Sequence, residues 1–204
     1  MELDRIRKMF TSNRSLKIVA FGDSFTYGWM VSRGYLDFLS DMLRQEYPEC
    51  SVSILNRGMP GDTAENGLYR LTSHVLDEDP DLVLIQFGLN DAYLGYSPDV
   101  YRKNILSMVE RIRNDTCARV LLLTSNYLPD ERENSMAEDF YSRLTDISRE
   151  QDVPVVPVHE YWREKVNNGT DHDSLVQGDR VHPTVEGYRL MAESIMKMIR
   201  GPGQ

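Results

Sequence analysis

Short apolar segments rich in β-branched residues recur along the chain at wide intervals. They are too short for buried helices and do not alternate strictly with polar residues, a pattern typical of strands that are covered on both faces. The expected strands are Leu16–Phe21, Val52–Leu55, Leu82–Phe87, Val120–Thr124 and Val153–Val158.

The segments between these strands carry apolar residues at the period of an amphipathic helix. Leu36, Leu39 and Leu43, for example, share one helical face. The same spacing of Leu3, Ile6 and Phe10 predicts a short N-terminal helix that packs on the domain. The other expected helices lie at about 35–47, 63–77, 99–112, 134–150 and 184–199.

Strands that alternate with helices imply parallel pairing through right-handed crossovers, with helices on both faces of the sheet. No repeat, low-complexity tract or linker interrupts the sequence. We therefore expect one doubly wound α/β domain over residues 1–204, with residues 1–14 as an N-terminal helical extension. Ligands of open parallel sheets bind at the carboxyl ends of the strands. The residues that directly follow each apolar segment are therefore the candidates for chemistry.

Composition narrows the possible partners. With 23 Lys and Arg against 32 Asp and Glu, the net charge of −9 argues against nucleic acid or an anionic membrane as the main partner. No apolar run is long enough to span a bilayer, and the N-terminus lacks the apolar core of a signal peptide, so a cytoplasmic location is expected. Cys50 and Cys117 are then expected to be buried and reduced, and the sequons at Asn13, Asn114 and Asn168 to be accidental.

Polar residues flanked by glycine follow several of the expected strands. The segments are "GDSFTYG" after the first strand, "NRGMPGDT" after the second, "GLND" after the third and "SNYLPD" after the fourth, with "GDRVHPT" before the last helix. Each is a weak signal alone, because such turns are common. Their joint occurrence at one edge of one sheet indicates a site.

These segments contain the groups that a serine hydrolase needs. Ser24 can act as the nucleophile, and the three-residue spacing of Asp179 and His182 lets the carboxylate reach the imidazole. Donors for an oxyanion are available from the backbone N–H groups of Ser24 and Gly61 and from the side chain of Asn90.

The set resembles the SGNH hydrolases, the family of GDSL-type esterases and lipases. "GDS", "PGDT", "GLND" and "DRVH" correspond to the four family blocks in the family's order. The resemblance implies a flavodoxin-like three-layer α/β/α sandwich around a five-stranded parallel sheet. It implies that Ser24 is the nucleophile, His182 the base and Asp179 the residue that orients it. It also implies an oxyanion hole of Ser24, Gly61 and Asn90, with no metal and no organic cofactor.

The sequence departs from the family pattern at Phe25, where leucine is usual. It also lacks the glycine two residues after the serine that an α/β-hydrolase elbow requires, which argues against that fold.

The expected substrate is a small carboxylic ester. Because the strand–helix units fill nearly the whole chain, little remains for a lid, and a short acyl group such as acetyl is favoured. Tyr27, Trp29, Tyr93 and Tyr96 follow the motif blocks and are candidates to flank an acylated sugar or aryl leaving group, although loop packing explains them equally well. The sequence is compatible with a homo-oligomer and does not determine the oligomeric state.

Two other classes of function remain open. One is a non-catalytic module on the same fold that binds a carbohydrate or peptide. The other is a metal-dependent phosphoesterase, which would leave Ser24 and Asn90 without a role. Its candidate residues are Asp23, Asp91, Asp171, Asp179 and His182. We interpret Asp23 and Asp91 instead as structural acids that accept backbone hydrogen bonds.

The remaining histidines are interpreted as structural. His74 is expected on a helix surface and His159 after the fifth strand, where a structural role is favoured over one in the site. His172 lies in "DHD", where adjacent side chains rarely converge on one metal ion, so an exposed polar loop is expected.

Overall fold

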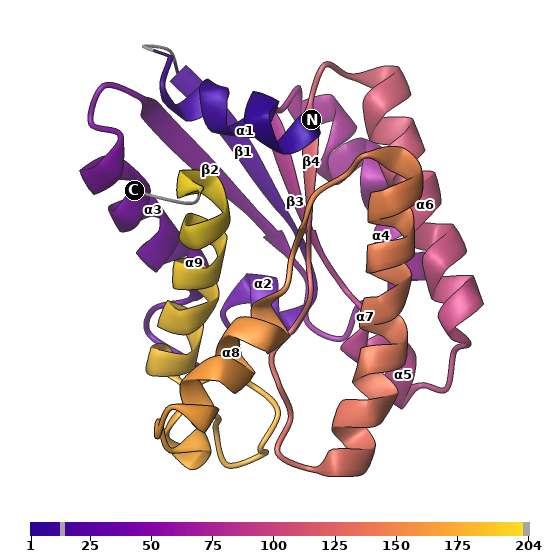
Figure 1. Ribbon diagram of the computed structural model, residues 1–204. Coiled ribbons are helices and arrows are strands. Elements are labelled where there is room, and N and C mark those ends of the chain that lie inside the picture. The colour runs from indigo at the N-terminus through magenta and orange to yellow at the C-terminus, as the bar shows by residue number, and fades with distance from the viewer. Residues whose placement is uncertain (13–14, 202–204) are drawn as a thin grey trace.

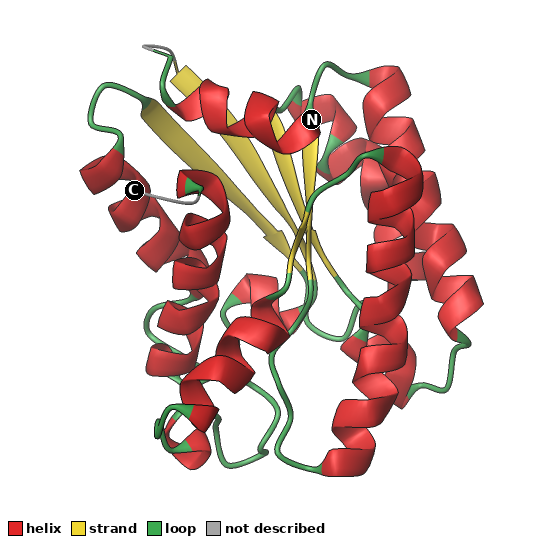
Figure 2. Ribbon diagram, viewed as in Figure 1, coloured by secondary structure: helices red, strands yellow, loops and turns green. Residues whose placement is uncertain are grey.

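All five expected strands form one parallel sheet, in the order β2-β1-β3-β4-β5. The computed structural model describes residues 1–12 and 15–201. This strand order is that of flavodoxin-like folds, and helices flank the sheet on both sides (Figure 2), which confirms the predicted three-layer sandwich. The strands are β1 (Ser15–Gly22), β2 (Ser51–Gly58), β3 (Leu82–Gln86), β4 (Arg119–Leu123) and β5 (Val155–Val156).

The helices form two layers (Figure 1). One apolar cluster joins α1, α3, α8 and α9 to one face of the sheet, and a second joins α4, α6 and α7 to the other. The helices are α1 (Glu2–Phe10), α2 (Ser24–Tyr27), α3 (Tyr35–Glu46), α4 (Ala64–His74), α5 (Leu89–Tyr93), α6 (Pro98–Asp115), α7 (Glu131–Gln151), α8 (Val158–Asn167) and α9 (Val185–Arg200), with short 3₁₀ turns at Leu76–Glu78 and His172–Ser174.

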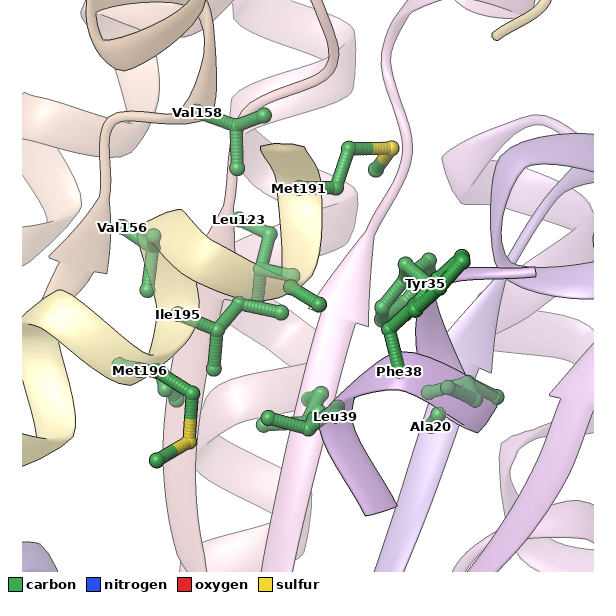
Figure 3. Close-up of a cluster of buried hydrophobic side chains, with 14 of the residues drawn as sticks. Ala20, Tyr35, Phe38, Leu39, Leu123, Val156, Val158, Met191, Ile195 and Met196 are labelled. Carbon is green, nitrogen blue, oxygen red and sulfur yellow. The ribbon is translucent and has the colours of Figure 1, made fainter. Parts of the chain in front are cut away.

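The strands are apolar throughout because each of their faces is buried. In β1, Ile18 and Ala20 belong to the cluster under α3 and α9, whereas Val19 and Phe21 belong to the cluster under α4 and α6. Figure 3 shows part of the first cluster, where Leu39 of α3 and Ile195 of α9 lie against the strands. The continuous burial explains why the sequence shows apolar runs instead of alternation.

The strand predicted over Val153–Val158 is shorter in the structure. Only Val155–Val156 pair with β4, and α8 begins at Val158. Pro154 and Pro157 flank the pair, and proline cannot donate a ladder hydrogen bond, which limits the strand on both sides. Helix α8 was not predicted because its first residue continues the apolar run.

Helix α1 lies across the amino ends of the strands (Figure 1). Its Ile6 and Phe10 are buried in the cluster that contains α9, and the Arg7 guanidinium donates to the Met198 carbonyl at 3.0 and 3.1 Å. The expected N-terminal helix is confirmed up to Phe10, while residues 13 and 14, and with them the sequon at Asn13, lie outside the described residues.

The two cysteines differ in their exposure. Cys50 is buried as expected, but Cys117 is exposed, because it lies in the turn between α6 and β4 and not in either element. Among the described residues, no helix is both long and apolar enough to cross a membrane.

The carboxyl ends of the neighbouring strands β2, β1 and β3 lie in register. Gly22 of β1 pairs with Gly58 of β2 on one side and with Gln86 of β3 on the other. The segments that follow these strands therefore leave the sheet side by side, at the edge opposite α1. They are the segments that contain Ser24, Gly61 and Asn90.

Replacement of Gly187 by alanine tests how the loop between α8 and α9 packs on α9. A Cβ there would lie 2.2 Å from the Leu175 carbonyl oxygen and 2.6 Å from Trp162. Although alanine favours the helix by about 1 kcal/mol, the clash with backbone dominates, and we expect Gly187→Ala to lower the free energy of unfolding by about 1–3 kcal/mol in urea titrations.

Gly178→Ala is the matched control, since a Cβ at Gly178 meets nothing within 4 Å. Its unfolding free energy should stay close to that of the wild type. A Gly187→Ala variant as stable as the wild type would contradict the packing described here.

Candidate active site

Ser24 lies at the start of α2, directly after β1, and is 6% exposed. Asp23 is the N-cap residue, and its Oδ1 accepts a hydrogen bond from the Phe25 N–H at 2.9 Å. The turn is tight, because a Cβ at Gly22 would lie 2.2 Å from Thr26 Oγ1 and 2.4 Å from the Gln86 carbonyl oxygen. Only glycine lets β1 deliver the serine to this point.

The loop before α9 brings an imidazole to the serine. His182 Nε2 lies 2.8 Å from Ser24 Oγ, and His182 Nδ1 lies 2.7 Å from Asp179 Oδ2. The other oxygen of Asp179 accepts the N–H groups of Val181 and His182, each at 2.9 Å. The structure thus brings Ser24, His182 and Asp179 together in one hydrogen-bonded series.

The carboxylate of Asp179 is held in its ionised form. Partial burial alone would raise its pKa, but the hydrogen bonds from Val181 and His182 outweigh burial and lower the pKa below its ordinary value. An ionised Asp179 favours a proton on Nδ1 of the imidazole. The Nε2 lone pair is then available to accept the proton of the serine hydroxyl.

Gln177 closes the loop that carries these two residues. Its backbone N–H donates to the His182 carbonyl at 2.7 Å, and its side-chain Nε2 donates to the Pro183 carbonyl at 2.8 Å. Val176 and Pro183 form an antiparallel bridge across the same loop. At the tip, Arg180 adopts a left-handed conformation with φ of 61°. The loop is therefore closed by hydrogen bonds among its own residues.

Two aromatic rings lie beside the imidazole. The ring centroids of Phe25 and Trp29 are 5.5 and 6.1 Å from that of His182. The backbone of Trp29 is anchored at both of its polar groups, since its N–H donates to the Tyr188 hydroxyl at 3.1 Å and its carbonyl accepts from Gln177 Nε2 at 2.9 Å. Trp29 is thus held in a defined place at the edge of the site.

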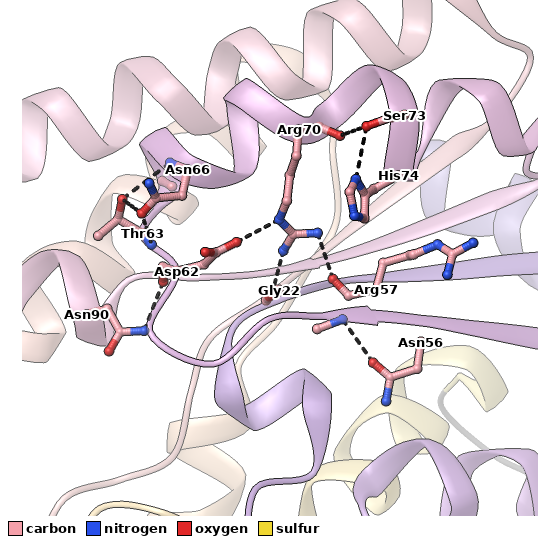
Figure 4. Close-up of polar contacts among 12 residues, drawn as sticks. Gly22, Asn56, Arg57, Asp62, Thr63, Asn66, Arg70, Ser73, His74 and Asn90 are labelled. Atoms are coloured by element: carbon pink, nitrogen blue, oxygen red, sulfur yellow. Dashed lines mark hydrogen bonds and ion pairs between the residues drawn. The ribbon is translucent and has the colours of Figure 1, made fainter.

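Two of the candidate oxyanion donors lie on adjoining segments, Gly61 in the loop after β2 and Asn90 in α5. Gly61 has a φ of 86° and is exposed, and Asn90 lies in the first turn of α5. The Asn90 Nδ2 donates to the carbonyl of Asp62 at 2.8 Å (Figure 4), which ties α5 to the loop of Gly61. A primary amide has two N–H groups, so this bond leaves one of them for a ligand.

The acidic residues that a metal-dependent phosphoesterase would use make separate hydrogen bonds in the structure. Both oxygens of Asp91 accept from the Ala64 N–H at 3.1 Å, and Asp171 caps the 3₁₀ turn that begins at His172. Asp23 and Asp91 thus accept backbone hydrogen bonds, as expected. Among the described residues, no group of three or more His, Cys, Asp or Glu side chains could hold a metal ion.

Burial raises the pKa values of two acids next to the site, Asp23 and Asp91. It raises the pKa of Asp23 to about 7, with a further contribution from the neighbouring Asp91 and Asp62 carboxylates. It also raises the pKa of Asp91 to about 6. Asp23 Oδ2 has no hydrogen-bond partner in the described part of the chain. The fold therefore favours neutral carboxyl groups here.

The other candidate aromatics lie on the surface near the site. Tyr27 and Tyr93 are 54% and 43% exposed, while the hydroxyl of the half-buried Tyr96 donates to Glu65 at 3.3 Å. Trp29 alone among the predicted aromatics contacts the imidazole ring.

Of the remaining histidines, His159 is buried as a packing residue. Its Nδ1 lies 2.8 Å from Thr124 Oγ1, and burial lowers its pKa to about 4. His74 is half-buried at the end of α4. The expectation for His172 is wrong, because it is half-buried against Tyr127 and Trp162 instead of exposed.

Sequence reasoning assigned no site role to Gln177, Tyr188 or Phe25. Tyr188 follows the helical period of α9 and is buried. Its hydroxyl nevertheless donates to the Ser24 carbonyl at 3.4 Å. No local motif indicates such a contact between residues far apart in the sequence.

A serine, a histidine and an aspartate hydrogen-bonded in series at the carboxyl edge of a parallel sheet are typical of hydrolases that transfer acyl groups. The sequence matches the GDSL-like Lipase/Acylhydrolase family over residues 20–190, and the chain belongs to that family. The resemblance expected from the four motif blocks is thereby confirmed.

Relatives from bacteria are similar over most of their length. An arylesterase from Vibrio mimicus is 28% identical over 90% of this chain and 88% of its own. An acetylxylan esterase from Geobacillus stearothermophilus is 25% identical over 81% of this chain and 80% of its own. A crystal structure of the Geobacillus enzyme aligns with a TM-score of 0.80 at 22% identity, covering 90% of this chain and 94% of that one. It supports the fold.

Asp23→Asn should weaken the pH dependence of stability. The folded protein binds the Asp23 proton more tightly than the unfolded chain does, so the free energy of unfolding falls as the pH rises from about 4 to about 7. An asparagine mimics the neutral carboxyl and keeps the helix cap. Urea midpoints measured across this window should therefore vary less in the variant, with the contribution of Asp91 remaining.

The control is Asp139→Asn, an exposed acid on α7, which should keep the wild-type dependence on pH. If Asp23→Asn showed the same pH dependence as the wild type, Asp23 would not be the group responsible.

Proposed function

We propose that the protein hydrolyses carboxylic esters through an acyl-enzyme on Ser24. The observation that carries the proposal is the hydrogen-bonded series of Ser24 Oγ, His182 and Asp179, at 2.8 and 2.7 Å. In the first step His182 Nε2 accepts the hydroxyl proton while Ser24 Oγ attacks the ester carbonyl carbon. The imidazolium then gives that proton to the departing alcohol, and the acyl group remains on the serine.

Deacylation uses the same groups in reverse order. Water donates a proton to His182 Nε2 and attacks the acyl carbon, and the bond to Ser24 Oγ breaks as the proton returns to the serine. In both steps negative charge develops on the carbonyl oxygen. The N–H groups of Ser24, Gly61 and Asn90 are the proposed donors to it, and a single such donor is typically worth about 3–4 kcal/mol.

We further propose a short acyl group and an alcohol that carries a ring. Two of the loops that border the site, between β2 and α4 and between α5 and α6, are short, which supports an open site without a long acyl tunnel. The names of the arylesterase and acetylxylan esterase relatives also support this choice. Because His182 must reach the leaving oxygen, the alcohol lies beside the imidazole, where Trp29 presents its ring.

Loss of the serine hydroxyl should abolish turnover. With p-nitrophenyl acetate, Ser24→Ala should lower kcat by at least about a thousand-fold, since the acyl-enzyme cannot form. EDTA should leave the wild-type rate unchanged. Ser142→Ala, which removes an exposed hydroxyl on α7, is the matched control and should retain full activity.

Other outcomes point to the alternative functions. Turnover that survives Ser24→Ala and is lost in EDTA would indicate a metal-dependent mechanism. A wild-type protein that hydrolyses no ester in a broad panel would indicate a binding module.

Truncation of Trp29 should affect ring-bearing substrates selectively. Aromatic contacts are worth about 0.5–1.5 kcal/mol beyond buried area, so Trp29→Ala should lower kcat/KM for phenyl acetate about 2–10-fold more than for ethyl acetate. Tyr69→Ala, which removes an aromatic ring that is 95% exposed on α4, should change neither value. Equal losses on both esters would argue against Trp29 as a platform for the alcohol.

A further inference from the structure

Arg70 is a buried arginine that belongs to none of the four motif blocks. It extends from the middle of α4 toward the site edge of the sheet and is 8% exposed. Its guanidinium donates to three acceptors on three segments, namely the Gly22 carbonyl at 2.9 Å, the Arg57 carbonyl at 2.9 Å and Asp62 Oδ2 at 2.6 Å (Figure 4). It also stacks on the ring of Phe21, at 4.2 Å.

These acceptors belong to the segments that carry the candidate catalytic groups. Gly22 is the last residue of β1, two positions before Ser24. Asp62 directly follows Gly61, and its carbonyl accepts the side-chain amide of Asn90 at 2.8 Å. A single guanidinium therefore connects the serine turn to the loop of Gly61 and, through Asp62, to Asn90 of α5.

The loop of Gly61 depends on such anchors. In the described part of the chain, a Cβ at Gly61 would meet nothing within 4 Å, so that side of the residue is open. The loop is fixed on either side instead, by the bond from the Met59 N–H to the Gly22 carbonyl at 2.9 Å and by the ion pair of Asp62 with Arg70. Without the guanidinium, Asp62 and two carbonyl groups would each lose a charge-assisted hydrogen bond.

Helix α4 aims Arg70 at these acceptors. Its N-terminus is fixed by a capping box, in which the Thr63 hydroxyl accepts from the Asn66 N–H at 3.3 Å and the Asn66 side chain accepts from the Thr63 N–H at 3.0 Å. The Asp91 carboxyl of α5 accepts a hydrogen bond from the Ala64 N–H. The direction of α4 is therefore set at the site itself.

We propose that Arg70 is a positioning residue for the oxyanion hole, which holds the N–H groups of Gly61 and Asn90 in register with Ser24. The proposal rests on the function proposed above. It predicts that loss of the guanidinium weakens binding of the tetrahedral intermediate more than binding of the ester. The effect of an Arg70 variant should therefore fall on kcat, with little change in KM.

Kinetics of Arg70→Met and Arg70→Lys provide the first test. We expect kcat for p-nitrophenyl acetate to fall about ten- to a hundred-fold in Arg70→Met, with KM within about two-fold. Arg70→Lys, which keeps the charge but not the planar fork, should lose less. Arg113→Met is the matched control, because Arg113 donates to the Gln151 and Asp152 carbonyls at the other end of the molecule. It should keep the wild-type kcat even if it unfolds at lower urea.

A double-mutant cycle separates positioning from general destabilisation. In an Asn90→Ala background the donor that Arg70 holds through Asp62 is already gone, so Arg70→Met should cost several-fold less in kcat than it does in the wild type. Fully additive losses would overturn the proposal. If Arg70→Met does not fold, the same cycle is run with Arg70→Lys.

A readout without turnover distinguishes this proposal from the function on which it rests. The ¹⁵N resonances of the Asn90 side-chain amide and the Gly61 backbone amide should shift or broaden in Arg70→Lys and stay unchanged in Arg113→Met. Unchanged resonances in the Arg70 variant would overturn the positioning role, whatever the activity. Shifted resonances in a protein whose wild type hydrolyses no ester would sustain the positioning role and refute the esterase proposal.

Discussion

At the carboxyl end of β1 the chain passes through a space that no side chain could occupy. The would-be Cβ of Gly22 falls 2.2 Å from Thr26 Oγ1 and 2.4 Å from the Gln86 carbonyl oxygen, while the Gly22 carbonyl accepts hydrogen bonds from Met59 and Arg70. This close approach joins β1 to the loops that follow β2 and β3. The relative placement of Ser24, Gly61 and Asn90 depends on it, since each lies only a few residues beyond these strand ends.

The same crowding creates an electrostatic cost. Asp23, Asp62 and Asp91 lie close enough to one another to raise the pKa of Asp23, and Arg70 is the cation that faces them from α4. A buried carboxyl in its neutral form needs less compensation than a charged one, and the raised pKa values of Asp23 and Asp91 favour that form. This group of side chains thus combines the ion pair of Arg70 with Asp62 and two carboxyl groups that accept hydrogen bonds from backbone N–H groups.

Much of the fold and of the candidate site could be predicted from the sequence, because the signals are local. Buried parallel strands require continuous apolar runs, and helices on both faces require the 3.6-residue period. The layers could therefore be predicted from this pattern, although the order of the strands could not. Ser24, Asp179 and His182 lie in short blocks whose spacing is set by turn geometry. Gln177, Tyr188 and Arg70 could not be found in this way, because each acts through partners far along the chain, and nothing near them in sequence distinguishes them from loop, core or helix-surface residues. The short β5 and the unforeseen α8 have a different cause, two prolines inside one apolar run.

The bond between Ser24 and His182 spans 158 residues, and that between Arg7 and Met198 spans 191. During synthesis on a ribosome the serine therefore emerges long before its imidazole. The loop of His182 also needs Tyr188 and Gly187 of the last helix to lie against the rest of the molecule. Closing such distant contacts is the slow part of folding, because chain entropy must be overcome before they form. A chain in which residues 182–200 have not yet been made would thus contain Ser24 without its imidazole partner and without the helix that places it.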